Sequence, residues 1–309
     1  MKGLGRKIIG GVIYAAAVLM LPYIITTLWQ GKIDTAAKES LGRTVVVKED
    51  RGSREISFEE YMTGVVAGQI DASYEIEAIK AQAILTRSFL CGIMEKQQMV
   101  DETTLRLDYY DKKRLAKAWG DAYENNYEKI RQAVTETKGQ IMTYDGRAAE
   151  GVYHKLSAGM TRDGTKAYPY LVPVASPKDL EADDFVTIKE YSFIDFIKIA
   201  LRLEDNISFS NGEAIALQVV ETDAAGYVKS AMIGTKTYDG ERIMEVFELP
   251  SCAFTFQTMD NKVRIICNGI GYGYGMSQYG ADRMAKEGSS AQEILKYYFP
   301  GVEIGEWKE

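Results

Sequence analysis

Four glycines stand at alternate positions near the C-terminus of the chain: Gly269, Gly271, Gly273 and Gly275. In an extended chain, residues two positions apart share one face, so this spacing leaves one face of the backbone without side chains. A ligand or another strand can then lie directly on main-chain donors and acceptors. The glycines do not fit the Gly-x-Gly-x-x-Gly spacing of a nucleotide-binding loop, and no Gly-Lys-Ser/Thr follows them. A Gly-rich turn before a helix is the alternative interpretation.

The polar residues after the glycines stand at the start of a predicted helix. Ser277 is a good N-cap for the amphipathic pattern over residues 278–286, and Gly288 is a good C-cap. The loop therefore presents side chains at a helix N-terminus. Tyrosine rings can stack on apolar faces of a ligand, and exposed main-chain groups can bond its polar groups. We expect a substrate-binding surface made by Tyr272, Tyr274, Ser277, Gln278 and Tyr279.

The rest of the pattern predicts an α+β fold of helices and antiparallel strands around a central cleft. Ser73 caps a long helix that runs to about Glu95 with apolar residues at helical spacing. Asp145-Gly146 is a strong two-residue turn signal between two strands. The expected strands are 43–48, 55–58, 140–144, 148–154, 253–257 and 262–267, with paired strands within 214–233. The other expected helices are 189–202, 240–247, 278–286 and 292–298.

The N-terminus carries a predicted membrane anchor. Residues 8–29 form an apolar run without charged side chains, preceded by Lys2, Arg6 and Lys7. At about 1.5 Å per residue, a helix of this length spans a hydrocarbon core of about 30 Å. A cleaved signal peptide is the alternative, but its apolar stretch is usually shorter. The basic residues place the N-terminus in the cytoplasm, so the chain after Lys32 is expected outside the cell membrane.

The expected organisation is a single-pass membrane protein with one large extracytoplasmic domain. That domain is long enough for one large core or two smaller ones. The parts are a cytoplasmic tip (1–7), the anchor (8–29), a tether (30–43), the domain (44–303) with an exposed excursion (96–137), and a tail (304–309).

Composition limits the partners of the extracytoplasmic part. The chain has 37 basic and 44 acidic residues and a net charge of −7, and the N-terminal basic residues lie before the anchor. An acidic protein has no long-range attraction for nucleic acid, anionic lipid or anionic wall polymer. We therefore expect no nucleic-acid partner. Any external polymer must be recognised at short range, through hydrogen bonds and aromatic stacking.

Cysteine and histidine content argues against a metal site or another cofactor. Cys91, Cys252 and Cys267 are too few and too scattered for a disulfide framework or a recognisable zinc site. A single Cys252–Cys267 disulfide and three buried thiols are the open alternatives. His154 is the only histidine, which excludes a multi-histidine metal centre and leaves a Ser-His-Asp triad only if His154 is the base.

Several motifs in one order resemble the stage II sporulation protein D family, which is related to the amidase enhancer. The first motifs are Glu59-Glu60-Tyr61 with Gly64-Val65-Val66-Ala67, then Glu77-Ala78-Ile79-Lys80-Ala81-Gln82-Ala83. The later ones are Tyr153-His154 with Ser157 and Gly159, then Gly275-Met276-Ser277-Gln278-Tyr279-Gly280-Ala281, and finally residues 293–301. The resemblance covers roughly residues 44–303.

The resemblance implies a membrane-anchored enzyme that cuts peptidoglycan glycan strands during spore engulfment. It implies a lytic transglycosylase, in which one carboxyl group protonates the glycosidic oxygen and then accepts the proton of the C6 hydroxyl of N-acetylmuramic acid. The implied partners are glycan strands already stripped of stem peptides, the amidase that strips them, and a membrane protein that gathers both enzymes.

The chain departs from the family at the position of the catalytic acid. The resemblance places that acid after Val-Val-Ala, in a Ser-Glu-Met-Pro context, where this chain has Gly68-Gln69-Ile70-Asp71. An amide cannot exchange protons at working pH, so Gln69 cannot act as a general acid. Asp71, two residues away, and Glu77, at the start of the long helix, are candidate displaced acids. The alternative role of Glu77 is a favourable charge at the helix N-terminus and a partner for Lys80.

Other positions of the resemblance also differ. The family motif reads Gly-Trp-Gly-His-Gly-Val-Gly. This chain has Ile270 in place of the tryptophan and Tyr272 in place of the histidine. Some members bind zinc near the histidine strand, but no cysteine accompanies His154, so we expect no metal there. His154 is either a base or a hydrogen-bonded strand residue. Three polar residues share one face of the long helix: Lys80, Gln82 and Arg87. They either line a substrate groove or are simply solvated.

Two hypotheses follow. The first is a glycan-cleaving enzyme, impaired by Gln69 or using Asp71 or Glu77 as a displaced acid. The second is a peptidoglycan-binding scaffold or amidase enhancer on the same fold, without cleavage.

Overall fold

The computed structural model describes residues 42–49, 52–94, 97–164, 166, 168–204, 207, 216–259 and 261–307. They form a mixed α+β fold in two compact units, a small one of residues 42–58 and 97–102 and a large one of residues 59–94 and 103–307. The predicted anchor, residues 8–29, lies outside the described residues. Among the residues that are described, no helix has the length and apolarity needed to cross a membrane.

The small unit is a three-stranded sheet. Strands β1 (Thr44–Glu49) and β2 (Gly52–Ser57) pair antiparallel, which confirms the predicted hairpin. β3 (Met99–Asp101) pairs in parallel with β1. Val45 and Val47 alternate along β1 with their side chains buried, as expected for a strand with one covered face.

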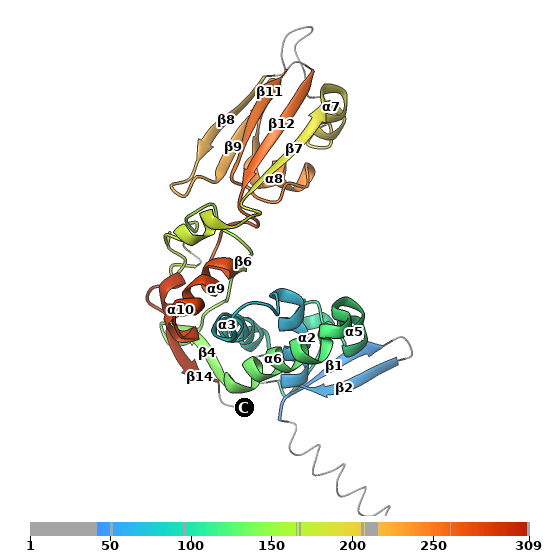
Figure 1. Ribbon diagram of the computed structural model, residues 1–309, viewed down its shortest axis with the longest axis vertical. Helices are drawn as coiled ribbons and strands as arrows, with labels where there is room; N and C mark the ends of the chain where they lie inside the picture. The colour runs from blue at the N-terminus through green and yellow to red at the C-terminus, as the bar shows by residue number, and fades with distance from the viewer. Residues whose placement is uncertain are drawn as a thin grey trace, which may run out of the picture. The chain divides into compact units, whose positions relative to one another are not determined.

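The helical part of the large unit is built around α3 (Ile76–Met94), the predicted long helix (Figure 1). α3 packs against α6 (Tyr123–Glu136), α9 (Gln278–Lys286), α10 (Ala291–Tyr298) and β4. Its apolar side chains join a core with those of α10, including Ile84, Leu85, Ile294 and Leu295. The remaining helices of this part are α2 (Phe58–Gln69), α4 (Glu102–Leu105), α5 (Lys112–Trp119) and the 3-10 turn η1 (Gly120–Ala122).

A small sheet closes this part of the unit. β4 (Gln140–Tyr144) pairs with β5 (Arg147–Ala148) and with β14 (Glu303–Glu306). The turn residues Asp145 and Gly146 both have positive φ, 48° and 72°, as the predicted tight hairpin requires. The hairpin pairing ends at Ala148, so the predicted strand 148–154 is wrong over residues 149–152. β6 (Tyr153–His154) instead pairs in parallel with β13 (Met276–Ser277), which follows the glycine segment.

The rest of the large unit consists of two three-stranded sheets with their own core. One has the order β10 (Lys236–Asp239), β9 (Val228–Ile233), β8 (Leu217–Thr222); the other is β11 (Phe254–Met259), β12 (Lys262–Asn268), β7 (Val186–Ser192). Side chains of these sheets bury apolar residues of α7 (Phe193–Ala200) and α8 (Gly240–Val246). The 3-10 helix η2 (Pro177–Glu181) precedes β7.

The predicted helix 189–202 is wrong over its first residues. Ser192 Oγ accepts a hydrogen bond from Asp195 N and so fixes the helix start at Phe193. The residues before it form β7, which pairs antiparallel with β12 along its whole length. The cap signal was present in the sequence, but the apolar residues on both sides of it suggested one continuous helix.

Candidate functional site

Gln69 is the last residue of α2 and opens a turn that leads into α3. The backbone N–H of Tyr74 donates to the carbonyl oxygen of Asp71 at 3.1 Å, and Ser73 N donates to the Asp71 carboxylate at 2.8 Å. Asp71 therefore stabilises the turn through both its backbone carbonyl and its carboxylate. The turn holds Gln69 and Asp71 on the same short stretch of surface.

Three side chains from α3 and α9 fix the orientation of the Gln69 amide. The backbone carbonyl of Gln69 only accepts hydrogen bonds, so the Gln278 atom 2.8 Å from it is the donor Nε2. That nitrogen also lies 3.0 Å from Gln82 Oε1. Gln82 Nε2 then donates to Gln69 Oε1 at 3.1 Å, and Thr86 Oγ1 lies 2.6 Å from the same oxygen. The oxygen of Gln69 faces Gln82 and Thr86, so its NH2 group points away from them.

Gln69 and Gln278 line one pocket of about 430 Å³, which we call the Gln69 pocket. Its walls also include Asp71 and Lys155, and a neighbouring pocket of about 580 Å³ shares Asp71, Tyr74 and Lys155 with it. The full lining of the Gln69 pocket is Gly68, Gln69, Ile70, Asp71, Tyr74, Tyr153, Lys155 and Gln278. The neighbouring pocket adds Glu181, Asp183, Asp184, Tyr279 and Arg283.

The glycine segment approaches the protein's own chain and not a pocket. All four glycines at alternate positions have positive φ, between 70° and 110°. A Cβ at Gly275 would lie 2.0 Å from the carbonyl oxygen of Val152, and one at Gly271 would lie 2.7 Å from His154 Cβ. Only glycine fits such close approaches and such a backbone. Of the two readings of the spacing, contact with another strand is the one that the structure shows.

The tyrosines of the glycine segment lie apart from the Gln69 pocket and line neither it nor its neighbour. The Tyr274 ring lies 4.5 Å from the guanidinium of Arg162, and its hydroxyl lies 3.3 Å from Glu241. Tyr272 is 41% exposed. Tyr279 lines the neighbouring pocket, where Arg283 lies 4.6 Å from its ring. The predicted surface of five side chains is therefore divided between separate places.

Two predicted substrate-binding residues are structural. Ser277 is fully buried, and its Oγ accepts from Gly280 N, so it is the N-cap of α9 and does not reach substrate. Arg87 is also fully buried and donates to the carbonyl oxygens of Thr137 and Val134 and to the Glu59 carboxylate. The prediction that these two residues contact substrate is wrong. Both side chains have their partners within the protein.

Glu77 and Lys80 belong to a surface ion-pair network outside both pockets. Lys80 Nζ lies 2.7 Å from the Glu77 carboxylate and 2.6 Å from that of Glu136. The other oxygen of Glu77 accepts from Ala291 N at 2.9 Å, which joins α3 to the start of α10. These contacts agree with the alternative role of Glu77, a favourable charge at the N-terminus of α3 that pairs with Lys80. Asp71 is the one candidate displaced acid that lines the Gln69 pocket.

His154 is a buried strand residue. Its Nδ1 donates to the carbonyl oxygen of Tyr274 at 2.9 Å, which assigns the neutral tautomer. Burial lowers the pKa of His154 to about 4. Nε2 is buried, and no described residue partners it. Within the described residues, no group of three or more His, Cys, Asp or Glu side chains could hold a metal ion, so the site does not fit a zinc ion.

Comparison with known proteins places the chain in a family. The sequence model of a family described as "Stage II sporulation protein" matches residues 48–144. The chain is 34% identical over 264 residues to "Stage II sporulation protein D" of Bacillus subtilis (strain 168), an alignment that covers 81% of this chain and 75% of that protein. The protein of the same description from Bacillus amyloliquefaciens gives the same identity and coverage. The chain belongs to the stage II sporulation protein D family.

A more distant relative is the "Amidase enhancer" of Bacillus subtilis (strain 168). It is 24% identical over 297 residues, which cover 79% of this chain and 40% of that protein. The predicted resemblance to the family and its relation to the amidase enhancer are thus confirmed. The coarse fold prediction, α+β, agrees with the structure.

Sequence reasoning missed a buried carboxylate in this family member. Asp179, on η2, is fully buried, and its Oδ2 accepts from Ser157 N at 2.8 Å. Burial raises the pKa of Asp179. A Cβ at Gly280 would lie 3.1 Å from Asp179 Oδ1, so the first turn of α9 packs directly on this carboxyl group. No local pattern in the sequence around Pro177 predicts that Asp179 is buried.

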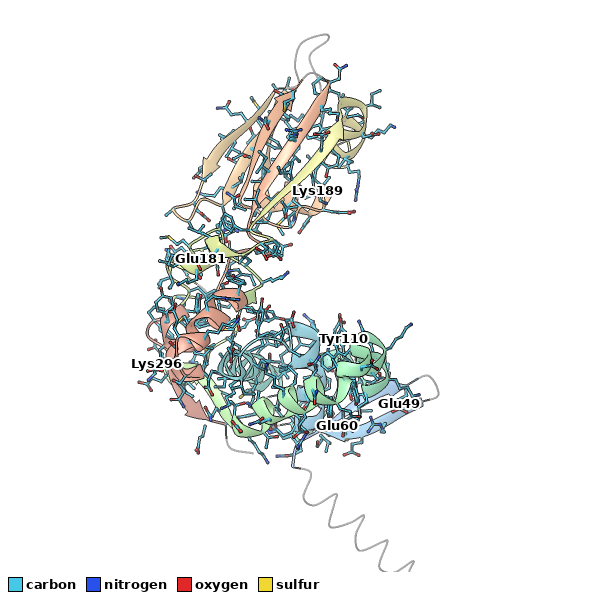
Figure 2. All side chains as sticks on the ribbon, in the orientation of Figure 1. Glu49, Glu60, Tyr110, Glu181, Lys189 and Lys296 are labelled. Carbon is cyan, nitrogen blue, oxygen red and sulfur yellow. The ribbon has the colours of Figure 1, made fainter. Side chains whose placement is uncertain are left out.

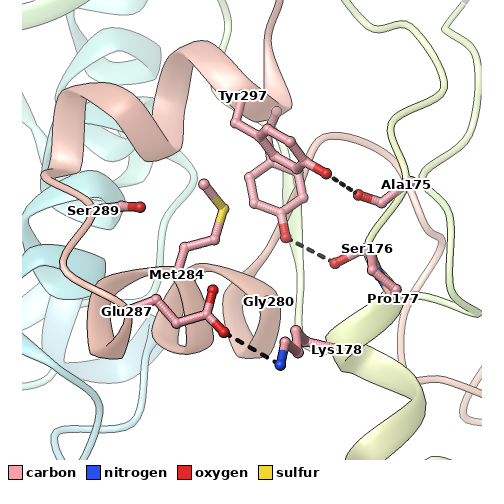
Figure 3. A pocket seen from close by; sticks show the side chains of 10 residues that line it. Ala175, Ser176, Pro177, Lys178, Gly280, Met284, Glu287, Ser289 and Tyr297 are labelled. Carbon is pink, nitrogen blue, oxygen red and sulfur yellow. Dashed lines mark hydrogen bonds and ion pairs between the residues drawn. The ribbon is translucent and has the colours of Figure 1, made fainter.

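The same first turn of α9 borders a separate cavity of about 270 Å³ (Figure 3). Tyr298 Oη lies 2.8 Å from Ser176 Oγ, and Tyr297 Oη donates to the carbonyl oxygen of Ala175 at 2.7 Å. These bonds join α10 to the loop before η2. Gly280, in the first turn of α9, lines the same cavity.

Thr86, Tyr74 and Lys155 are further site residues that the sequence analysis did not select. Thr86 lies one helical turn after Gln82 on α3, and this spacing was the available signal. Lys155 Nζ pairs with Asp184 at 2.7 Å. Burial raises the pKa of Tyr74 to about 12, with Asp282 and Asp71 adding to the effect.

Proposed function

We propose that this protein binds peptidoglycan glycan strands in the Gln69 pocket and, on its own, cleaves them weakly or not at all. One observation carries the proposal: the oxygen of the Gln69 amide is held by Gln82 and Thr86. The resemblance to the family puts its catalytic acid at this residue. The NH2 group is left as the part of that side chain available to a ligand. Such a group can donate a hydrogen bond to a sugar oxygen, but it cannot give up its proton.

The chemistry of lytic transglycosylation explains why this matters. A general acid contributes about 10² to 10⁴ to the rate, and its loss removes that factor. The same position also has to accept the proton of the C6 hydroxyl when the 1,6-anhydro ring closes. An amide does neither, although its NH2 group can still donate a hydrogen bond to a bound strand. The proposal is therefore a glycan-binding member of the family with impaired cleavage.

The setting of this activity is part of the proposal. Residues 8–29 would anchor the protein in the cell membrane, with the N-terminus in the cytoplasm and the described residues outside. The partners would be glycan strands stripped of stem peptides, a peptidoglycan amidase and a membrane scaffold protein of the engulfment machinery. The names of the relatives, a sporulation protein and an amidase enhancer, support this setting.

Replacing Gln69 by Glu tests the proposal. Full-length protein in detergent is incubated with purified glycan strands without stem peptides, and 1,6-anhydro ends are counted by mass spectrometry. We expect few or no ends from the wild type, strand binding by both proteins, and about 10² or more additional ends from Gln69→Glu. Gln292→Glu, the same change at an exposed position on α10, is the matched control and should leave cleavage unchanged.

A second candidate function is a lytic transglycosylase that uses Asp71. It is favoured by the position of Asp71 in both pockets. Robust cleavage by the wild type would support it and would contradict an impaired enzyme. Failure of the wild type to retain glycan strands would contradict both.

A further inference from the structure

Helix α5 carries an uncompensated positive charge on an acidic protein. Its sequence, Lys-Lys-Arg-Leu-Ala-Lys-Ala-Trp, has four basic residues and no acidic one, whereas the whole chain has a net charge of −7. All four basic side chains are exposed, and none forms an ion pair with a carboxylate of the described residues. The four residues, which we call the α5 basic patch, are Lys112, Lys113, Arg114 and Lys117.

The position of these charges is unfavourable for the helix itself. Lys112, Lys113 and Arg114 occupy the first turn, where the helix dipole is positive and favours acidic side chains. Asp111 offsets part of this cost, because its carboxylate accepts from Arg114 N at 2.7 Å as the N-cap. A local violation of helix rules without an internal partner is typical of a surface kept for a ligand.

The α5 basic patch borders the Gln69 pocket. Gly68, which lines that pocket, lies against Tyr110, since a Cβ at Gly68 would be 2.5 Å from Cδ2 and Cε2 of the tyrosine. The guanidinium of Arg114 lies 3.5 Å from the centre of the Tyr110 ring. Tyr110 precedes the N-cap of α5 and is half-buried (Figure 2). One aromatic ring therefore separates the pocket rim from Arg114 of the patch.

Aromatic rings continue beside the patch. The rings of Trp119 and Tyr123 have centroids 6.5 Å apart, and those of Tyr123 and Tyr127 lie 5.6 Å apart. Lys112 Nζ lies 5.5 Å from the centre of the Tyr127 ring. All three rings are half-buried, so each packs against the protein and exposes part of its surface to solvent. Such a row offers apolar faces to sugar rings next to cations.

We propose that the α5 basic patch binds carboxylate groups of a glycan strand whose other part occupies the Gln69 pocket. The inference rests on the proposed function and adds a second contact surface to it. A strand without stem peptides carries a free lactyl carboxylate on each N-acetylmuramic acid, and these charges repeat along the polymer. Exposed lysines meet these carboxylates at short range, within a Debye length, where the local positive charge of the patch outweighs the net negative charge of the protein.

The test compares two variants of equal charge in the full-length protein in detergent. Lys112→Gln/Lys113→Gln/Lys117→Gln removes three charges of the patch, and Lys198→Gln/Arg202→Gln/Lys229→Gln removes three exposed charges on and near the distant sheets. The probes are purified strands without stem peptides and the same strands with their carboxylates converted to methyl esters. Arg114 is kept because it packs on Tyr110, and melting temperatures verify that both variants fold.

We expect the patch variant to bind the free-carboxylate strands about tenfold more weakly than the wild type, and the control variant to bind them normally. The esterified strands should bind the wild type and the patch variant equally. Equal losses in both variants would overturn the inference, as would unchanged binding in the patch variant, and in either case the proposed function would stand. Micelles containing phosphatidylglycerol are a third probe. A patch variant that loses affinity for these micelles alone would also overturn the inference and assign α5 to the membrane surface.

Discussion

The side-chain amide of Gln278 donates a hydrogen bond to the backbone carbonyl of Gln69 across 2.8 Å, although 209 positions separate the two residues in the sequence. The same amide bonds Gln82 on α3. One side chain thus joins the end of α2, the middle of α3 and the start of α9. The Gln69 pocket depends on this junction and not on any single loop.

Gln278→Leu should therefore destabilise the fold. Gln278 is 5% exposed, and the change leaves two acceptors, Gln69 O and Gln82 Oε1, without their donor. We expect the free energy of unfolding to fall by about 1–3 kcal/mol in urea titrations. Gln292→Leu, at an exposed position of α10, is the matched control. Its expected change in the free energy of unfolding is within about 0.5 kcal/mol. Equal effects of the two changes would contradict the junction.

The two displaced-acid candidates are separated by conservative changes. Asp71→Asn and Glu77→Gln should each leave the weak cleavage by the wild type unchanged, because neither carboxyl is expected to be the acid. Counting 1,6-anhydro ends by mass spectrometry measures this. A loss of cleavage in Asp71→Asn alone would assign the acid to the turn at the pocket, and a loss in Glu77→Gln alone would assign it to α3.

Tyr279 and Tyr272 should differ in glycan binding. Tyr279 lines the pocket next to the Gln69 pocket, whereas Tyr272 lines neither. Tyr279→Ala should weaken the retention of glycan strands by about 0.5–1.5 kcal/mol, the usual contribution of an aromatic contact. Tyr272→Ala, a truncation of a tyrosine on the glycine segment, should have no effect. A larger loss in Tyr272→Ala would place the sugar surface on the glycine segment after all.

Local patterns in the sequence were enough to predict the elements that are long or tightly capped. The 3.6-residue period of α3 and the Asp145-Gly146 turn are both of this kind. The strand β7 was not predicted, because its pairing with β12 depends on residues at least 70 positions away that no local pattern reveals. Apolar residues before Ser192 suit a helix or a strand equally until that partner is known.

Only those residues of the site that lie in motifs of the family resemblance could be predicted from the sequence. Gln69, Gln82 and Gln278 were all selected from motifs, and the structure brings them together. Polar type alone was misleading, since Arg87 and Ser277 were selected as polar residues and both are fully buried. Net charge was misleading as well, because a whole-chain value of −7 conceals the basic α5.

Arg87 should be one of the most sensitive positions of the core. Its guanidinium bonds two backbone carbonyls and the Glu59 carboxylate in a fully buried position. Arg87→Met keeps most of the side-chain volume but leaves these acceptors unpaired, so we expect a loss of about 3–5 kcal/mol in the free energy of unfolding. Arg131→Met, at an exposed ion pair on α6, should cost less than about 1 kcal/mol. A small effect at Arg87 would mean that water replaces it.

His154 should make stability depend on pH in the acid range. Burial lowers its pKa from the ordinary value of 6.5 to about 4, so between these values the unfolded chain binds a proton that the folded protein does not. The contribution of neutral His154 is fully present above about pH 6.5 and is lost as the pH falls toward 4, by an amount on the order of 3 kcal/mol.

His154→Asn isolates this contribution from all other titrating groups. The Asn amide nitrogen can take the place of Nδ1 and donate to the Tyr274 carbonyl oxygen, but it does not titrate. Urea unfolding of the wild type and the variant at several pH values between 4 and 8 measures the difference in stability. We expect this difference to shrink or reverse in favour of the variant as the pH falls below about 6.5. A difference that is constant with pH would show that His154 takes up a proton equally well in the folded protein, and its buried neutral state would then be wrong.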